Sequence, residues 1–183
     1  SERGIEALGV CDRDGLYGVA RAFAEAKKIE HRLLVGAELS IEMPGSPLSG
    51  ISTPDRRIAL IAIDHDGYES LCRLLTRAHE GHEKGEAGIT VAEIAAANRG
   101  LFALVPSEPF VTSDAVLGPV VEAFRERALL AAYRHAEPRD ATRTEIARQA
   151  EKRYGLQIIA SARPVMHLAD RKRLADVLAC IRH

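Results

Sequence analysis

The sequence predicts an α/β domain built on a mostly parallel sheet. Short runs of aliphatic residues, of strand length, alternate along the chain with stretches whose apolar residues recur every three or four positions. With 183 residues, 46% of them hydrophobic, the chain can fill one core of its own. Regular alternation of strands and helices favours a parallel sheet covered by helices.

Six runs are predicted to be strands, and they lie at 6–11, 33–39, 58–63, 101–105, 129–133 and 156–161. The periodicity does not decide whether these strands form an open sheet or a closed barrel.

The helices between the strands are predicted from apolar stripes and capping residues. Thr90 and Glu93 have the spacing of a capping box. A later helix is predicted over 144–154. Two apolar stripes carry the earlier helices: Leu16, Val19, Ala20, Phe23 and Ala24 in the first, and Leu71, Leu74 and Leu75 in the second.

The charge balance argues against a general affinity for polyanions. The 25 basic and 26 acidic residues leave a formal net charge of -1, so any contact with DNA is expected to be local. No apolar run reaches the roughly 18 residues of a membrane span, and no signal-peptide pattern opens the sequence. We therefore expect a cytoplasmic protein that does not enter a membrane.

Four segments together resemble the PHP (polymerase and histidinol phosphatase) domain of bacterial C-family DNA polymerases. They are VCDRDGLYGVARAFAEAKK (10–28), GAEL (36–39), LIAIDHDGYESLCRLLTRA (60–78) and ADRKRLADVLACIR (169–182). The DGLYG motif and the last segment are most similar to the error-prone branch of the DNA polymerase III alpha subunits.

This resemblance implies a distorted seven-stranded β/α barrel. It also implies a polar turn at 64–67 that opens a helix, with Asp66 as the capping residue. The family's first strand, with its His-x-His motif, would precede Ser1, so the chain is expected to be a fragment with six of the seven strands. It implies a single domain over 1–183, in which 170–183 forms a helix leading toward the polymerase core.

The family's metal ligands are largely replaced when the motifs are matched position by position. Only the carboxylate Glu38 keeps its ligand type, and an arginine cannot bind a metal. The resemblance therefore implies no catalytic residue and no bound metal. The former metal-site positions are Arg13, Glu38, Arg57, Ser107, Arg163 and Val165.

The replacements suggest that a salt-bridge centre has taken the place of the metal. An isolated ionised carboxylate inside the former site would be costly, and a guanidinium group can pair with it through two hydrogen bonds. We expect Glu38 to pair with Arg13 and Arg163, and on a looser alignment with Arg57. The alternative is that these arginines face solvent.

The function implied by the resemblance belongs to a larger protein. It is a DNA-directed DNA polymerase of replication and damage-tolerant repair synthesis, whose nucleotidyltransferase centre and Mg²⁺ would lie in a palm domain beyond His183. The fragment would need no cofactor. Its partners would be the remainder of the polymerase chain, DNA through that chain, the sliding clamp and mutagenesis accessory proteins. The alternatives are a free-standing, metal-dependent phosphoesterase similar to histidinol-phosphate phosphatase, and a non-catalytic binding module.

Overall fold

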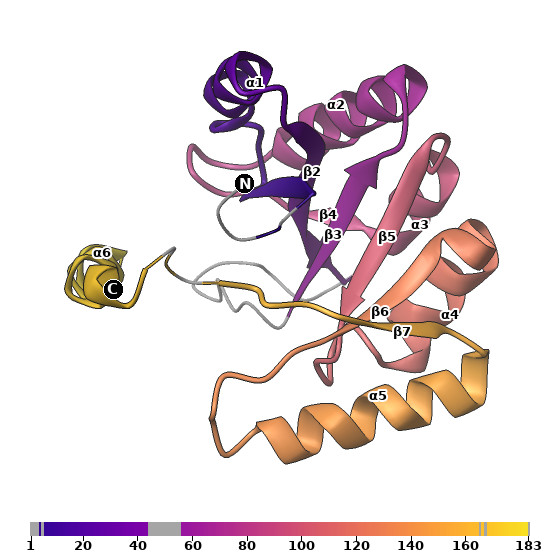
Figure 1. The fold of residues 1–183 in the computed structure, drawn as a ribbon. Helices are drawn as coiled ribbons and strands as arrows, with labels where there is room; N and C mark the ends of the chain where they lie inside the picture. The colour runs from indigo at the N-terminus through magenta and orange to yellow at the C-terminus, as the bar shows by residue number, and fades with distance from the viewer. Residues whose placement is uncertain (1–3, 5, 44–55, 165, 167, 183) are drawn as a thin grey trace.

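The computed structural model describes residues 4, 6–43, 56–164, 166 and 168–182 (Figure 1). Within them the strands form one sheet in the order β1-β2-β3-β5-β6-β7, and the short β4 pairs with β2 beside this path. The strands are β1 (Ala7–Arg13), β2 (Arg32–Glu42), β3 (Arg57–Ala62), β4 (Ile89–Thr90), β5 (Leu101–Pro106), β6 (Ala128–Ala132) and β7 (Gln157–Ala160).

The sheet is parallel except at β3. The pairs β1–β2, β2–β4, β5–β6 and β6–β7 are parallel, whereas β3 is antiparallel to both β2 and β5. Parallel neighbours need a crossover connection, which α1, α4 and α5 provide, and antiparallel neighbours do not. The prediction of a mostly parallel α/β fold is confirmed, and the shape is that of a distorted, strongly curved sheet with β1 and β7 at the two ends of the path.

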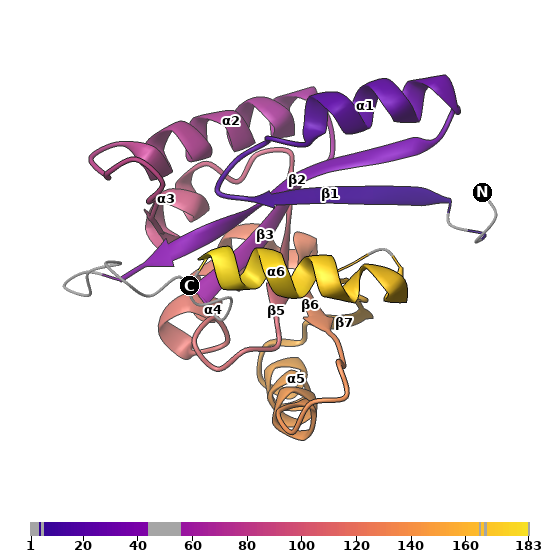
Figure 2. The same cartoon turned by 90° about the vertical axis from the view of Figure 1, so that its left-hand side faces the viewer.

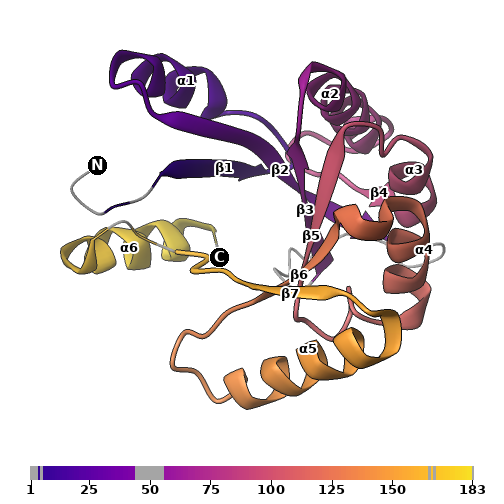
Figure 3. The same ribbon diagram turned by 45° about the vertical axis from the view of Figure 1, so that its right-hand side comes forward.

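In the part of the chain that the structure describes, five helices lie on the outside of this curved sheet, and a sixth lies apart on its inner side (Figures 2 and 3). These helices are α1 (Val19–Lys28), α2 (His65–His79), α3 (Val91–Ala96), α4 (Asp114–Phe124), α5 (Asp140–Tyr154) and α6 (Lys172–Arg182), and the 3-10 turns η2 (Arg125–Arg127) and η3 (Ala169–Arg171) accompany them. In the described part of the chain, no helix has the length and apolar character needed to cross a membrane.

One of the two predicted helix caps is present in the structure, and the other is formed by a different residue. The Thr90–Glu93 capping box at the start of α3 is confirmed. The prediction of Asp66 as the cap of α2 is wrong, because Asp64 accepts the Gly67 N–H at 2.8 Å. Asp66 lies inside the first turn and forms an ion pair with Arg99. A residue already in helical conformation cannot place its side chain over the free N–H groups of its own turn.

The hydrophobic core fills the space between the outer face of the sheet and the helices that cover it. Strand residues that alternate along β2, β3 and β5 point into this layer, as the period of two requires. The opposite face of the same strands borders a cavity, which it lines with Glu38, Arg57, Ala59, Ile61, Leu104 and Pro106. Large, fully buried core residues include Leu39, Ile41, Ile58, Leu60, Leu71, Ile94, Leu101, Leu117, Phe124 and Leu130.

Candidate functional site

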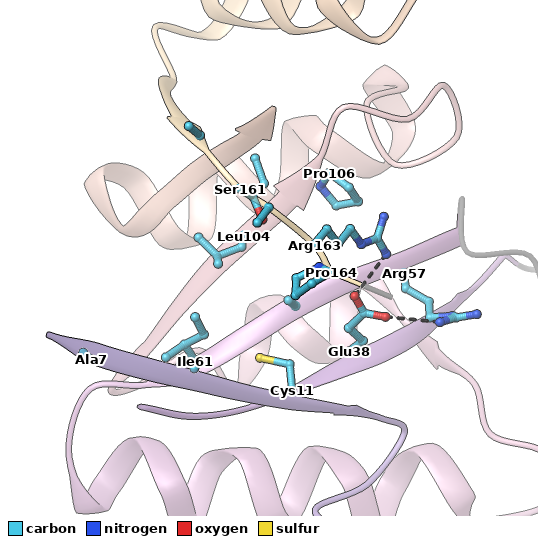
Figure 4. A pocket seen from close by; sticks show the side chains of 15 residues that line it. Ala7, Cys11, Glu38, Arg57, Ile61, Leu104, Pro106, Ser161, Arg163 and Pro164 are labelled. Atoms are coloured by element: carbon cyan, nitrogen blue, oxygen red, sulfur yellow. Dashed lines mark hydrogen bonds and ion pairs between the residues drawn. The ribbon is translucent and has the colours of Figure 1, made fainter. Parts of the chain in front are cut away.

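A cavity of about 770 Å³ lies on the inner face of the sheet (Figure 4). Every strand of the main path contributes to its wall, as does the segment 161–164 that follows β7. Most of the wall is apolar or small, and its charged groups are Glu38, Arg57 and Arg163. The remaining lining residues are Ala7, Gly9, Cys11, Ala59, Ile61, Leu104, Pro106, Ala131, Ala160, Ser161, Ala162 and Pro164.

Both carboxylate oxygens of Glu38 accept hydrogen bonds from guanidinium groups. Arg57 Nη1 donates to Oε2 at 3.1 Å, and Arg163 Nη2 donates to Oε1 at 3.0 Å. Glu38 lies on β2 and Arg57 opens the neighbouring strand β3, whereas Arg163 comes from beyond β7 across the cavity (Figure 4). The side chains of Glu38, Arg57 and Arg163 are 21%, 14% and 23% exposed, so this centre is largely shielded from water.

Arg13 takes a different partner from the one predicted. Its Nε donates to Asp14 Oδ2 at 3.2 Å, and its side chain is 41% exposed. Asp14 is itself buried and accepts the backbone N–H and the hydroxyl of Ser40, both at 2.8 Å. Arg13 is paired with Glu38 in the β1–β2 register, but adjacent Asp14 offers a carboxylate that needs no crossing of the strand pair.

A second buried cluster continues the network from Arg163 to α5. Arg163 Nη1 donates to the hydroxyl of Tyr133 at 3.0 Å, and that hydroxyl donates to Glu108. Arg143 on α5 donates from Nε to the same Glu108 oxygen at 2.8 Å. The guanidinium groups of Arg143 and Arg163 also lie over the Tyr133 ring, 4.8 Å and 5.2 Å from its centroid. A continuous hydrogen-bonded chain therefore runs from Arg57 on β3 to α5.

The charges of this network are matched to one another. Glu108 and Arg143 are 2% and 8% exposed, so each would be costly without its partner. Burial lowers the pKa of Arg57, and the negative charge of Glu38 only partly offsets this. Burial also favours a lower pKa for Arg163, but the interactions with Glu38 and Tyr133 are stronger together, and the pKa of Arg163 is raised. Burial, reinforced by the hydrogen bond to Glu108, raises the pKa of Tyr133 to about 12.

The remaining predicted positions add no cation-binding group. Ser107 is fully buried at the end of β5, and its hydroxyl has no hydrogen-bond partner among the described residues. Val165 lies outside the described residues. Burial and the nearby charge of Glu38 raise the pKa of Cys11 to about 11, which opposes the thiolate form that binds metals.

The side chains around Glu38 do not fit the metal centre that the fold implies. A divalent cation needs several lone-pair donors together, and the described residues contain no group of three or more His, Cys, Asp or Glu side chains placed to share one. Both Glu38 oxygens instead face positively charged groups.

Sequence reasoning missed Tyr133, Glu108 and Arg143. One signal was present for Arg143, which lies four and seven residues before Ala147 and Ala150 and therefore on the buried face of α5. A charged residue on such a face needs a buried partner. Glu108 follows directly after Ser107, at the end of the strand where a barrel collects its functional groups.

Comparison with known proteins gives one family match. A family model described as PHP domain matches residues 1–160. The chain is 39% identical over 194 aligned residues to an error-prone DNA polymerase of Anaeromyxobacter sp. (strain K), and 31% identical over 189 to one of Aromatoleum aromaticum. Both alignments include the whole chain but only 16% and 17% of those relatives.

A solved structure supports the fold. It is a Bifidobacterium adolescentis protein to which metal-dependent phosphoesterase activity is provisionally ascribed, and it superposes with a TM-score of 0.57 at 13% identity, over 87% of this chain and 77% of the other. At that identity the likeness concerns the fold alone.

Proposed function

Because the chain belongs to the PHP domain family, we propose that it is the PHP region of an error-prone DNA polymerase, with an architectural role and no hydrolytic activity of its own. The polymerase assignment is supported by relatives of that name that match the whole chain. The chain spans about 16% of the length of the relatives it matches, so nucleotidyl transfer and its Mg²⁺ are assigned to the rest of such a protein.

One observation carries the architectural role: both oxygens of Glu38 are bonded to guanidinium groups. A cation at Glu38 would have to displace Arg57 and Arg163 and would then lie beside their two positive charges. The ion pairs supply the positive charge that the carboxylate needs, and they join β2, β3 and the segment after β7. The centre thus braces the barrel interior where a PHP phosphoesterase would hold its metals.

Activity measurements test this proposal directly. The whole chain, supplied in turn with Mn²⁺, Zn²⁺ and Mg²⁺, is incubated with a chromogenic phosphate ester and with labelled single-stranded DNA. We expect no turnover above that of a Glu38→Ala variant. Metal-dependent turnover that disappears in Glu38→Ala would overturn the proposal and favour a metal-dependent phosphoesterase.

The setting of the protein follows from the same assignment. We assign it to the cytoplasm, with the remainder of the polymerase chain as its first partner and DNA reached through that chain. Contacts with a sliding clamp or with mutagenesis accessory proteins belong to the same proposal. Helix α6, at 172–182, would lead toward the polymerase core.

A further inference from the structure

The segment that leaves the barrel after β7 is fastened at Arg163. The N–H of Ser161 donates to the carbonyl of Ala132 at 2.9 Å, which extends the β6–β7 pairing by one residue. The ring of His135 lies within hydrogen-bonding distance of the Ala162 carbonyl, at 3.2 Å. The guanidinium of Arg163 then bonds to Glu38 on β2 and to Tyr133 just beyond β6. Three successive residues are therefore tied to the barrel.

The backbone of Arg163 adopts an unusual conformation at the point where these contacts are made. Its φ is +41°, in the left-handed region that favours glycine and is costly for a residue with a long side chain. Such a conformation persists where the surroundings hold it in place. Here the guanidinium group is held by two partners: Nη2 donates to the Glu38 carboxylate, and Nη1 donates to the Tyr133 hydroxyl while the group lies over the Tyr133 ring.

Among the described residues, helix α6 has few other contacts that could place it. It packs mainly against the turn η3 that precedes it, and it lies apart from the other helices (Figures 1 and 3). Its apolar residues follow the spacing of one helix face but remain at least half exposed, so they do not fix the helix on the barrel. These residues are Leu174, Val177, Leu178 and Ile181, with exposed fractions of 51%, 56%, 51% and 75%.

We propose that Arg163 is a positioning residue that sets the direction of the chain leaving the barrel, and through it the placement of α6. This proposal rests on the proposed function in one respect: the Glu38 carboxylate must bind the Arg163 guanidinium and not a metal. In this arrangement the former metal site determines where the apolar face of α6 is presented to the next part of the protein. Loss of the anchor would free α6 while leaving the core unchanged.

The test uses the exposed native Cys180 on α6 as a spin-label site. Cys11 and Cys72 are replaced by alanine, and Gln149→Cys on the exposed face of α5 provides the second label. Distances between the labels are measured by pulsed electron paramagnetic resonance in the presence of EDTA, so the result is independent of whether the site can bind metal.

We expect one narrow distance peak in the chain with Arg163 intact, and loss of that peak in Arg163→Gln. Arg163→Lys, which keeps the charge, should retain part of the peak. Arg153→Gln removes an exposed arginine of α5 that pairs with Asp114, and should leave the peak unchanged. If Arg163→Gln does not fold, Tyr133→Phe removes one of the two anchoring contacts and should broaden the distribution.

Two results would overturn the proposal. One is the same narrow peak in the folded Arg163→Gln and Tyr133→Phe variants. The other is a broad distribution already present when Arg163 is intact. A change in melting temperature alone would not support the proposal, because a purely structural role would produce it too. Metal-dependent hydrolysis, if found in the activity assay, would refute the proposed function whatever the distances show.

Discussion

Replacing Glu38 and Arg163 with glutamine, singly and together, measures how strongly the two side chains depend on each other. Glutamine keeps much of the length of each side chain and removes its charge. The double-mutant cycle then separates the pairwise free energy from the separate cost of each replacement, which includes the lost Arg163–Tyr133 contact.

The expected coupling free energy between Glu38 and Arg163 lies between the values for a buried and an exposed ion pair. Breaking a fully buried ion pair costs about 3 to 5 kcal/mol, and an exposed pair contributes about 0 to 1 kcal/mol. Glu38 and Arg163 are 21% and 23% exposed, which lies nearer the buried limit. Glu38 keeps Arg57 as a partner at 3.1 Å, so it is not stranded when Arg163 is lost. We therefore expect a coupling free energy of about 1 to 2 kcal/mol.

The assay is urea unfolding of the whole chain at low and at high salt. A matched control is the cycle of Arg13→Gln with Asp14→Asn, whose pair has an arginine that is 41% exposed. Its coupling should be below about 0.5 kcal/mol and should weaken further in salt. A coupling for Glu38 and Arg163 no larger than this control would refute the view that the two side chains form a shielded ion-pair centre.

Two other predictions concern the buried phenol and the start of α2. The pKa of Tyr133 is raised from its ordinary 10.0 to about 12, so its stabilising contribution should be complete below pH 10 and lost as the pH rises toward 12. The difference in tyrosinate absorbance between the whole chain and Tyr133→Phe follows the ionisation of this phenol, and a midpoint near pH 10 would contradict the prediction. In Gly67→Ala the new Cβ would lie 1.8 Å from the carbonyl oxygen of Gly100, and overpacking of this kind costs about 1 to 3 kcal/mol or more. Gly9→Ala, which meets nothing within 4 Å, is the control for urea unfolding, and equal stabilities would refute the argument.

The positions of the strands could be predicted from the sequence, but their directions in the sheet could not. All six predicted strands are present with shifts of a few residues at their ends. The two-residue β4 is too short to show any alternation. The antiparallel course of β3 was not predicted, because a period of two is the same in both directions. Helix α4 was also missed: its apolar residues lie around most of its surface, so no clear stripe marks it, and it contains Pro119, a residue that is disfavoured inside helices.

Only part of the site follows from the sequence. The alignment of motifs singled out Glu38, Arg57 and Arg163 as replaced or retained ligands, and the structure brings these three together. The alignment could not show which arginine pairs with Glu38, because Arg13 and Arg163 have the same charge and differ only in their neighbours. Asp14 beside Arg13 decides that case. Tyr133 and Glu108 lie 25 residues apart and meet only because β5 and β6 are adjacent in the sheet.

The most direct test of the central claim is a crystal structure of the whole chain grown with excess Mn²⁺, with an anomalous difference map calculated at the site. The account predicts nitrogens of Arg57 and Arg163 within about 4 Å of the Glu38 carboxylate oxygens, the limit of an ion pair, and no anomalous peak between them. An anomalous peak bonded to Glu38 at about 2 Å, with the two guanidinium groups turned away, would contradict it.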